Sequence, residues 1–186
     1  MKRMILTALL VSCLPVFVYA EAALPFSDED NFIRNSSFEL FDKNNAPVDW
    51  VLWKKNQDKL EKISNGSSPD GKSHIRLTGS EKSKAQMRTE VYSVTPGKYM
   101  IRGKMRGKGK LSVLIYVYEK TDPIEIHVRD LNVRTNWRTF AVPCEVGAKA
   151  NRFCLVLRTD NVVELDQISV VPVFEKKVFP GVARQM

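Results

Sequence analysis

Apolar and polar residues alternate with a period of two through most of the sequence, and this pattern constrains the fold most strongly. The clearest run places Leu111, Val113, Ile115 and Val117 in alternation with Ser112, Leu114, Tyr116 and Tyr118. Similar alternation recurs around Ile101, Leu155 and Val170, and no convincing helical period appears beyond residue 30. The pattern predicts an all-β chain built from half-buried strands.

Turn-forming residues separate these runs at intervals of roughly 8–12 residues, which is typical of an antiparallel sandwich. In Thr95-Pro96-Gly97-Lys98 the proline presets φ and the glycine accepts a positive φ. Gly107-Lys108-Gly109-Lys110 is expected to turn one strand into the next. We expect strands near 38–41, 50–54, 59–63, 73–78, 86–94, 98–106, 110–119, 124–131, 137–142, 152–158 and 163–173.

The first twenty residues have the pattern of a secretory signal peptide. A basic start is followed by an apolar stretch, and Val18-Tyr19-Ala20 offers small residues at a cleavage point before Glu21. This predicts a secreted or periplasmic protein with no transmembrane span in the mature chain. Alternatively, Leu10-Val11-Ser12-Cys13 matches a lipobox, which would leave the protein lipid-anchored through Cys13.

The rest of the chain divides into three segments. Residues 21–30 are acidic and are expected to form a loose lead-in, residues 31–174 form the sandwich, and residues 175–186 are a basic tail. The net charge of +8 falls to +6 when cleavage removes Lys2 and Arg3. A basic surface attracts polyanions, and export favours acidic polysaccharides over nucleic acid.

Cys144 and Cys154 remain after cleavage, and an even pair in an exported protein suggests a disulfide. A hairpin turning at 147–150 would place the two thiols opposite each other. The alternative is two buried free thiols, which pack as small hydrophobic groups.

Six short motifs occur in an order that resembles one known family. They are Asn31-Phe32-Ile33-Arg34-Asn35-Ser36-Ser37-Phe38-Glu39, Pro47-Val48-Asp49-Trp50, Asp70-Gly71-Lys72-Ser73-His74-Ile75-Arg76-Leu77, Val94-Thr95-Pro96-Gly97-Lys98-Tyr99, Trp137-Arg138-Thr139-Phe140 and Val163-Glu164-Leu165-Asp166-Gln167-Ile168-Ser169-Val170. The series resembles the CenC-type carbohydrate-binding modules of families four, nine and twenty-two. The resemblance spans about residues 31–173 and implies a galactose-binding-like jelly roll.

The resemblance also implies a structural calcium ion between Glu39 and Asp166, although Gln167 stands where a second aspartate is usual. The alternative is that both carboxylates cap loops through hydrogen bonds. Phe38 is expected to point into the sandwich, and Trp50 and Trp137 are assigned to the core.

Modules of this kind stack sugar rings on exposed aromatic side chains and bind hydroxyl groups with polar ones. The candidate carbohydrate-binding residues are Trp53, Gln86, Arg88, Arg102, Tyr116 and Tyr118. Alternation places Tyr116 and Tyr118 on an outer sheet face, and we expect Arg102 on the neighbouring strand beside them. The alternative is an ordinary solvated sheet face.

The sequence carries no signature of an enzyme. His74 and His127 have no evident nucleophilic partner, and phosphate-loop, His-Glu-x-x-His and Cys-x-x-Cys motifs do not occur. The leading hypothesis is therefore an exported, non-catalytic module that binds an oligo- or polysaccharide, acidic or neutral. The alternative is an envelope structural or protein-interaction module, and a hydrolase that uses Glu39 or Asp166 is the weakest reading.

Overall fold

The computed structural model describes residues 31–52, 59–64, 66–69 and 71–173. These residues form antiparallel strands and contain no α-helix. The strands are β1 (Trp50–Leu52), β2 (Leu60–Ile63), β3 (His74–Thr78), β4 (Ala85–Thr89), β5 (Tyr92–Ser93), β6 (Gly97–Gly107), β7 (Lys110–Tyr118), β8 (Pro123–Asn132), β9 (Arg138–Val146), β10 (Arg152–Thr159) and β11 (Val162–Pro172). The predicted all-β class is confirmed.

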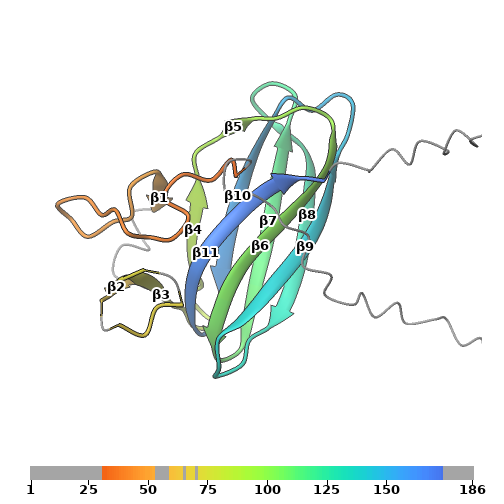
Figure 1. Ribbon diagram of the computed structural model, residues 1–186. Coiled ribbons are helices and arrows are strands. Elements are labelled where there is room, and N and C mark those ends of the chain that lie inside the picture. Colours follow the sequence, from red (N-terminus) through yellow and green to blue (C-terminus); the bar gives the residue numbers. More distant parts are fainter. Residues whose placement is uncertain (1–30, 53–58, 65, 70, 174–186) are drawn as a thin grey trace, which may run out of the picture.

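Two sheets pack face to face, and in Figure 1 β11, β6 and β9 lie in front of β10, β7 and β8. We call the first sheet the β10 sheet, with strand order β1-β4-β10-β7-β8 and β5 paired to β10. The second is the β11 sheet, with order β2-β3-β11-β6-β9. The chain repeatedly crosses between the sheets, as it does from β6 to β7 and from β9 to β10. This is the predicted β-sandwich.

The core lies between the sheets and consists of the inward half of each alternating strand. Buried residues include Ile75 and Leu77 of β3, Leu155 and Leu157 of β10, and Leu165 of β11. Their neighbours in sequence therefore point to the two outer faces, since successive side chains of a strand alternate. The outer faces carry the aromatic and charged side chains that are candidates for binding.

The predicted strand at 38–41 is wrong, because the backbone there is not extended. Residues 34–37 form a turn in which Asn35 has a φ of 48°, Phe38 follows with a φ of 54°, and residues 38–41 make one isolated bridge, from Phe41 to Pro47. The Asn35 amide donates to the carbonyls of Leu40 and Val48, and its oxygen accepts from the Leu40 amide. The loop still delivers Phe38 to the core, where the Phe38 and Trp50 rings lie 5.2 Å apart.

The expected strand at 86–94 is two strands, β4 and β5. The Leu155 amide donates to the Thr89 hydroxyl, and that hydroxyl donates to the Glu90 carbonyl. A side chain thus takes the place of a ladder bond and ends β4. Tyr92 then packs against Phe153 in the core, so it does not share the outer face with Gln86 and Arg88.

The signal peptide, the lead-in and the basic tail lie outside the described residues, as do Cys13 and Trp53. The proposed boundaries at 20, 30 and 174 stay predictions. No helix in the described part of the chain is long and apolar enough to span a bilayer.

Candidate functional site

The outer face of the β10 sheet holds a groove of about 580 Å³. Its walls and floor come from three strands (β4, β7 and β10) and two connections, and it is lined by Arg88, Val91, Tyr116, Tyr118, Thr121, Arg152, Cys154 and Val156. Three of the predicted carbohydrate-binding residues, Arg88, Tyr116 and Tyr118, therefore meet in one groove. None of the lining residues is acidic.

Strand register explains how these residues meet. Tyr116 lies opposite Cys154 and Tyr118 lies opposite Arg152 in the pairing of β7 with β10, while Val156 lies opposite Arg88 in the pairing with β4. Directly opposed residues share a face, so β10 brings together side chains from strands far apart in sequence.

The floor of the groove is apolar and buried. Leu114, Cys154 and Val156 form a small cluster against which Tyr116 and Tyr118 pack. Burial raises the pKa of the Tyr118 hydroxyl, and the neighbouring Cys154 adds to the effect. The hydroxyl thus stays protonated at neutral pH and can donate as well as accept a hydrogen bond.

The rim carries positive charge. Arg88 donates to the Thr89 carbonyl from one guanidinium nitrogen, which fixes its position beside the floor. Arg152 reaches the same groove from the start of β10. Sequence reasoning missed Arg152, although the alternation of Phe153, Leu155 and Leu157 toward the core already placed Arg152 on the outer face.

Two other predicted residues do not line this groove. Gln86 is two residues from Arg88 on β4, on the same outer face and opposite Arg158. Arg102 is on β6 in the β11 sheet, so the expectation that it lies beside Tyr116 and Tyr118 is wrong. The Gly107–Gly109 turn crosses between the sheets and sends the two strands to different layers.

Arg102 instead lines a smaller hollow of about 280 Å³ on the outer face of the β11 sheet. That hollow is polar and contains Ser36, Lys104, Thr139 and Gln167 among its lining residues. It carries no aromatic side chain, so it offers no flat apolar surface for a sugar ring.

The disulfide prediction is corrected by the structure, in which Cys144 and Cys154 are both buried free thiols. Cys144 is on β9 and faces the core, whereas Cys154 is on β10 and faces outward into the groove. The connection at 147–150 passes from one sheet to the other and does not form a hairpin. Packed sheets lie about 10 Å apart, beyond the Cα separation that a disulfide spans.

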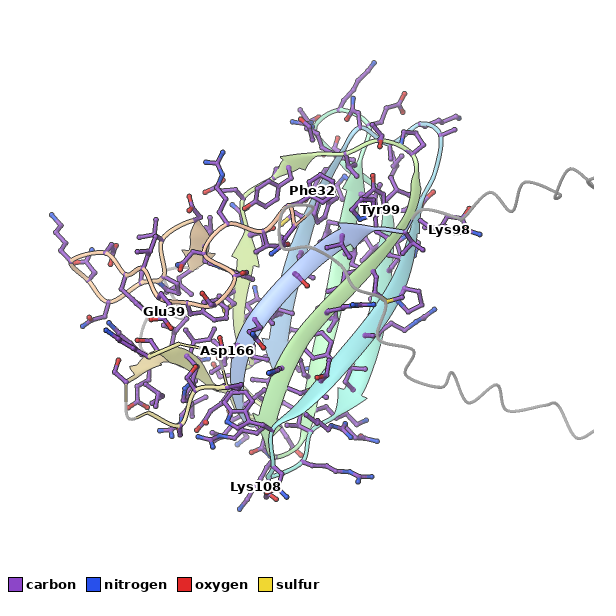
Figure 2. The ribbon with its side chains drawn as sticks, in the orientation of Figure 1. Phe32, Glu39, Lys98, Tyr99, Lys108 and Asp166 are labelled. Carbon is purple, nitrogen blue, oxygen red and sulfur yellow. The ribbon has the colours of Figure 1, made fainter. Side chains whose placement is uncertain are left out.

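Glu39 and Asp166 hold one loop, that of residues 64–73, from two places, and Figure 2 shows both on the same side of the molecule. Glu39 Oε1 accepts from the amides of Lys72 and Ser73 at 2.8 and 3.0 Å. Asp166 accepts from the Ser68 hydroxyl at 2.6 Å and from the Gln167 amide at 2.8 Å.

These contacts match the loop-capping alternative. Calcium needs six to eight oxygen ligands, whereas N–H and O–H donors point at these two carboxylates. The described residues also contain no group of three or more acidic, His or Cys side chains placed to hold a metal. The calcium ion stays a prediction.

A third carboxylate, Glu164, centres a buried polar cluster on the outer face of the β11 sheet. It accepts hydrogen bonds from His74 at 3.0 Å, from Arg76 at 2.8 and 3.0 Å, and from Arg106. Burial alone would raise the pKa of Glu164, but the bonds from Arg76 and Arg106 outweigh burial and the pKa is lowered. A carboxylate so neutralised is structural rather than a free acid or base.

Trp137 belongs to this cluster, so its assignment to the central core is wrong. It is half-buried, lies edge-on to His74 at 5.2 Å and carries Arg106 over its ring at 4.8 Å. Its indole nitrogen donates to the Ser67 carbonyl. Trp50 is buried in the core as predicted.

No family model matches the sequence, and no curated protein matches it either. Solved structures do share its fold. The enzymatically active domain of bacteriophage CBA120 tailspike protein 4 matches with a TM-score of 0.64 at 9% identity, over 79% of this chain and 22% of that one. The chain therefore spans about a fifth of the tailspike chain.

Two carbohydrate-binding modules match over almost their whole length. A family 16 module gives a TM-score of 0.58 at 17% identity, over 76% of this chain and 99% of the module. A family 61 module, solved in complex with β-1,4-galactotriose, gives 0.54 at 9% identity, over 77% and 99%. This chain has the jelly-roll fold of carbohydrate-binding modules, as the motifs predicted.

Proposed function

We propose that this protein binds carbohydrate without catalysis, in the groove on the outer face of the β10 sheet. The observation that carries the proposal is the meeting of Tyr116 and Tyr118 with Arg88 and Arg152 over an apolar floor. Flat tyrosine rings suit the apolar face of a pyranose, and guanidinium groups donate to hydroxyls or carboxylates.

The two arginines favour an acidic polysaccharide over a neutral one. Arg88 and Arg152 are the charged residues of the groove, and no carboxylate opposes them there. A uronate or sulfate group can pair with a guanidinium through two hydrogen bonds. The structures with the same fold include a module bound to a neutral galactotriose, which supports the class of ligand rather than its charge.

The absence of acidic residues from the groove lining also supports a non-catalytic role. Glycoside hydrolysis uses a pair of carboxyl groups that flank the scissile bond. Asp166 is fully buried and Glu39 holds loop amides, so neither is placed as a free acid or base. We further propose export by the N-terminal segment, which cell fractionation with residues 1–20 present or deleted would test.

Affinity-gel retardation against a panel of neutral, uronic-acid and sulfated polysaccharides tests the proposal. Tyr116→Ala and Tyr118→Ala are each expected to weaken retardation roughly tenfold, because each removes a stacking surface of about 1–2 kcal/mol. Arg88→Ala is expected to weaken binding to acidic polymers more than to neutral ones.

Arg102→Ala is the matched control, because it removes the same charge from the opposite sheet. It should leave retardation unchanged, and a thermal melt should show that every variant is folded. If both tyrosine variants are folded and still retarded like the unaltered protein, the groove is not the binding site.

A further inference from the structure

Strand β8 is the free edge of the β10 sheet. It pairs with β7 along one side and has no partner on its other side among the strands that the structure describes. A free edge presents a row of unpaired amide and carbonyl groups, and proteins usually block long edges with bulges, prolines or inward charges. Pro123 and a bulge protect the start of β8, and Glu125, His127 and Arg129 add polar side chains on its core-facing side. The pairing with β7 is nevertheless regular from Glu125 to Asn132, so the other edge of β8 is straight enough to accept a strand.

The outer face of this edge is apolar and exposed. Ile124, Ile126 and Val128 expose 44%, 51% and 42% of their surface. Ile126 lies opposite Tyr116 and Val128 lies opposite Leu114, so these residues extend the apolar floor of the groove to the rim of the sheet. An apolar stripe beside unpaired backbone marks a surface that another strand can cover.

The opposite face of β8 carries a charge pattern that complements itself. Glu125, His127 and Arg129 follow one another along that face, and Glu125 and Arg129 are both exposed. Within one copy, His127 Nε2 lies 3.2 Å from one oxygen of Glu125, which leaves the other carboxylate oxygen for a second donor. In an antiparallel pair of identical strands centred on His127, Glu125 of each copy lies opposite Arg129 of the other. The same register places Ile126 opposite Val128 on the apolar face and leaves Asp130 opposite Ile124 at each end of the contact.

Neighbouring registers lose this match. A pair centred on Val128 would place His127 opposite Arg129 and Glu125 opposite Leu131, so neither charged residue would meet an opposite charge. A pair centred on Ile126 would place Glu125 opposite His127 and Ile124 opposite Val128, but Arg129 would lie opposite Pro123, without an acidic partner. Opposite charges in directly opposed positions stabilise an antiparallel pair, and like charges destabilise it.

We infer that a second copy of this chain pairs with β8, antiparallel, about a two-fold axis centred on His127. The axis is perpendicular to the sheet, because residues on one face of β8 meet residues on the same face of the other copy. The two β10 sheets then form one continuous sheet, and both copies present the Tyr116 groove on the same side. The contact is isologous, so it closes as a dimer.

Charge reversal tests this dimer by sedimentation of the purified chain over a range of concentrations. In the two-fold dimer the Glu125–Arg129 contact occurs at two symmetry-related places. Glu125→Arg places two arginines opposite each other at both places, and Arg129→Glu places two glutamates there. Each variant is expected to raise the dimer dissociation constant roughly tenfold or more. The double variant Glu125→Arg with Arg129→Glu restores opposite pairs and should restore the dimer. Glu81→Arg, the same charge change at an exposed turn, should have no effect.

A cross-link tests the register independently. His127→Cys places two thiols directly opposite each other, where Cβ atoms lie about 5 Å apart, and should form an intermolecular disulfide under mild oxidation. Asp130→Cys places the thiols on the order of 20 Å apart and should not. The unaltered chain, with buried Cys144 and Cys154, gives the background.

Three results would overturn the inference. One is a monomer at every concentration, and another is a dimer whose dissociation constant does not respond to either charge reversal. The third is a different protein that co-purifies with the chain and blocks the His127→Cys cross-link, which would show that another partner covers β8.

Discussion

Glu164 shows how one residue can hold an outer sheet face together. Its side chain is almost buried and receives three donor side chains from two strands, with His74 and Arg76 on β3 and Arg106 on β6. A buried carboxylate is stable only when such donors offset its desolvation. Removing it leaves two guanidinium groups without their shared partner.

Glu164→Gln is therefore expected to lower the free energy of unfolding by about 2–4 kcal/mol. Glu61→Gln is the matched control, because Glu61 bonds the same Arg76 but its side chain is 61% exposed. Exposed pairs contribute less than about 1 kcal/mol. Urea unfolding gives the free energy of unfolding of both variants. An equal loss in Glu164→Gln and Glu61→Gln would contradict a structural role specific to Glu164.

His74 makes the stability depend on pH. Burial lowers the pKa of His74 below its ordinary value and outweighs the attraction of Glu164. The unfolded chain therefore binds the proton more readily than the folded one, and the free energy of unfolding falls as pH drops below about 6.5. The lowered pKa of Glu164 adds a loss in the same direction at more acidic pH, below about 4.3.

The urea midpoint is thus expected to fall steadily from pH 7 to pH 5. His74→Gln should lose most of this dependence in that range, since it removes the group that the unfolded state protonates. A midpoint that rises on acidification would contradict the assignment.

The two described cysteines should be unreactive in the folded protein. Burial raises the pKa of the Cys144 thiol to about 11 and raises the pKa of the Cys154 thiol as well, so little thiolate forms at neutral pH. We expect peptide mapping to show both unlabelled by iodoacetamide in the native state. Both should be labelled after denaturation without reductant, whereas a disulfide would leave them unlabelled.

At the scale of elements, side-chain hydrogen bonds decide where strands end. Asn35 pins the loop between residues 35 and 48, and Thr89 ends β4 by bonding β10 through its hydroxyl. Both are short polar side chains that compete with the backbone ladder. The alternation of polar and apolar residues predicted strands at 38–41 and 86–94. It reports side-chain polarity and not hydrogen-bond partners, so it could not show where a side chain ends a strand.

Asn35 has two roles, because its amide group holds the loop and its backbone adopts a positive φ. The substitutions Asn35→Ala and Asn35→Gly separate these roles. Both remove the amide bonds to Leu40 and Val48, but only glycine adopts a φ of 48° without strain. We expect alanine to lower the free energy of unfolding by about 1–3 kcal/mol and glycine by less. Thermal or urea melts measure the difference, and an equal loss would show that backbone strain is not involved.

At the scale of the whole molecule, the groove and the β8 edge lie on one sheet, so the two proposals act together. Two grooves on the same side of a dimer can engage one polysaccharide chain at once and raise the apparent affinity. The Glu125→Arg monomer is expected to bind a short oligosaccharide as before and to lose roughly tenfold or more in retardation on the polymer. Equal losses on both ligands would show that the substitution disturbs the groove itself.

Calcium provides a second test of the whole fold. An ion that binds only the folded chain raises the melting midpoint with its concentration. If Glu39 and Asp166 only cap the loop, the midpoint will be the same in excess calcium and in EDTA, whereas the predicted calcium ion requires a higher midpoint with calcium. A rise with calcium would show that the loop of residues 64–73 rearranges to bind the ion.

The sequence by itself determined the class of fold, most strand positions and the outward direction of Arg88, Tyr116 and Tyr118. Alternation and turn residues depend on neighbours a few positions apart, so both can be recognised in the sequence. Only the tertiary structure decided that Arg102 lies on the opposite sheet, that Trp137 covers a polar cluster and that Cys144 and Cys154 lie apart. These depend on which sheet each strand joins, and the chain crosses between sheets at turns that look in sequence like ordinary hairpins.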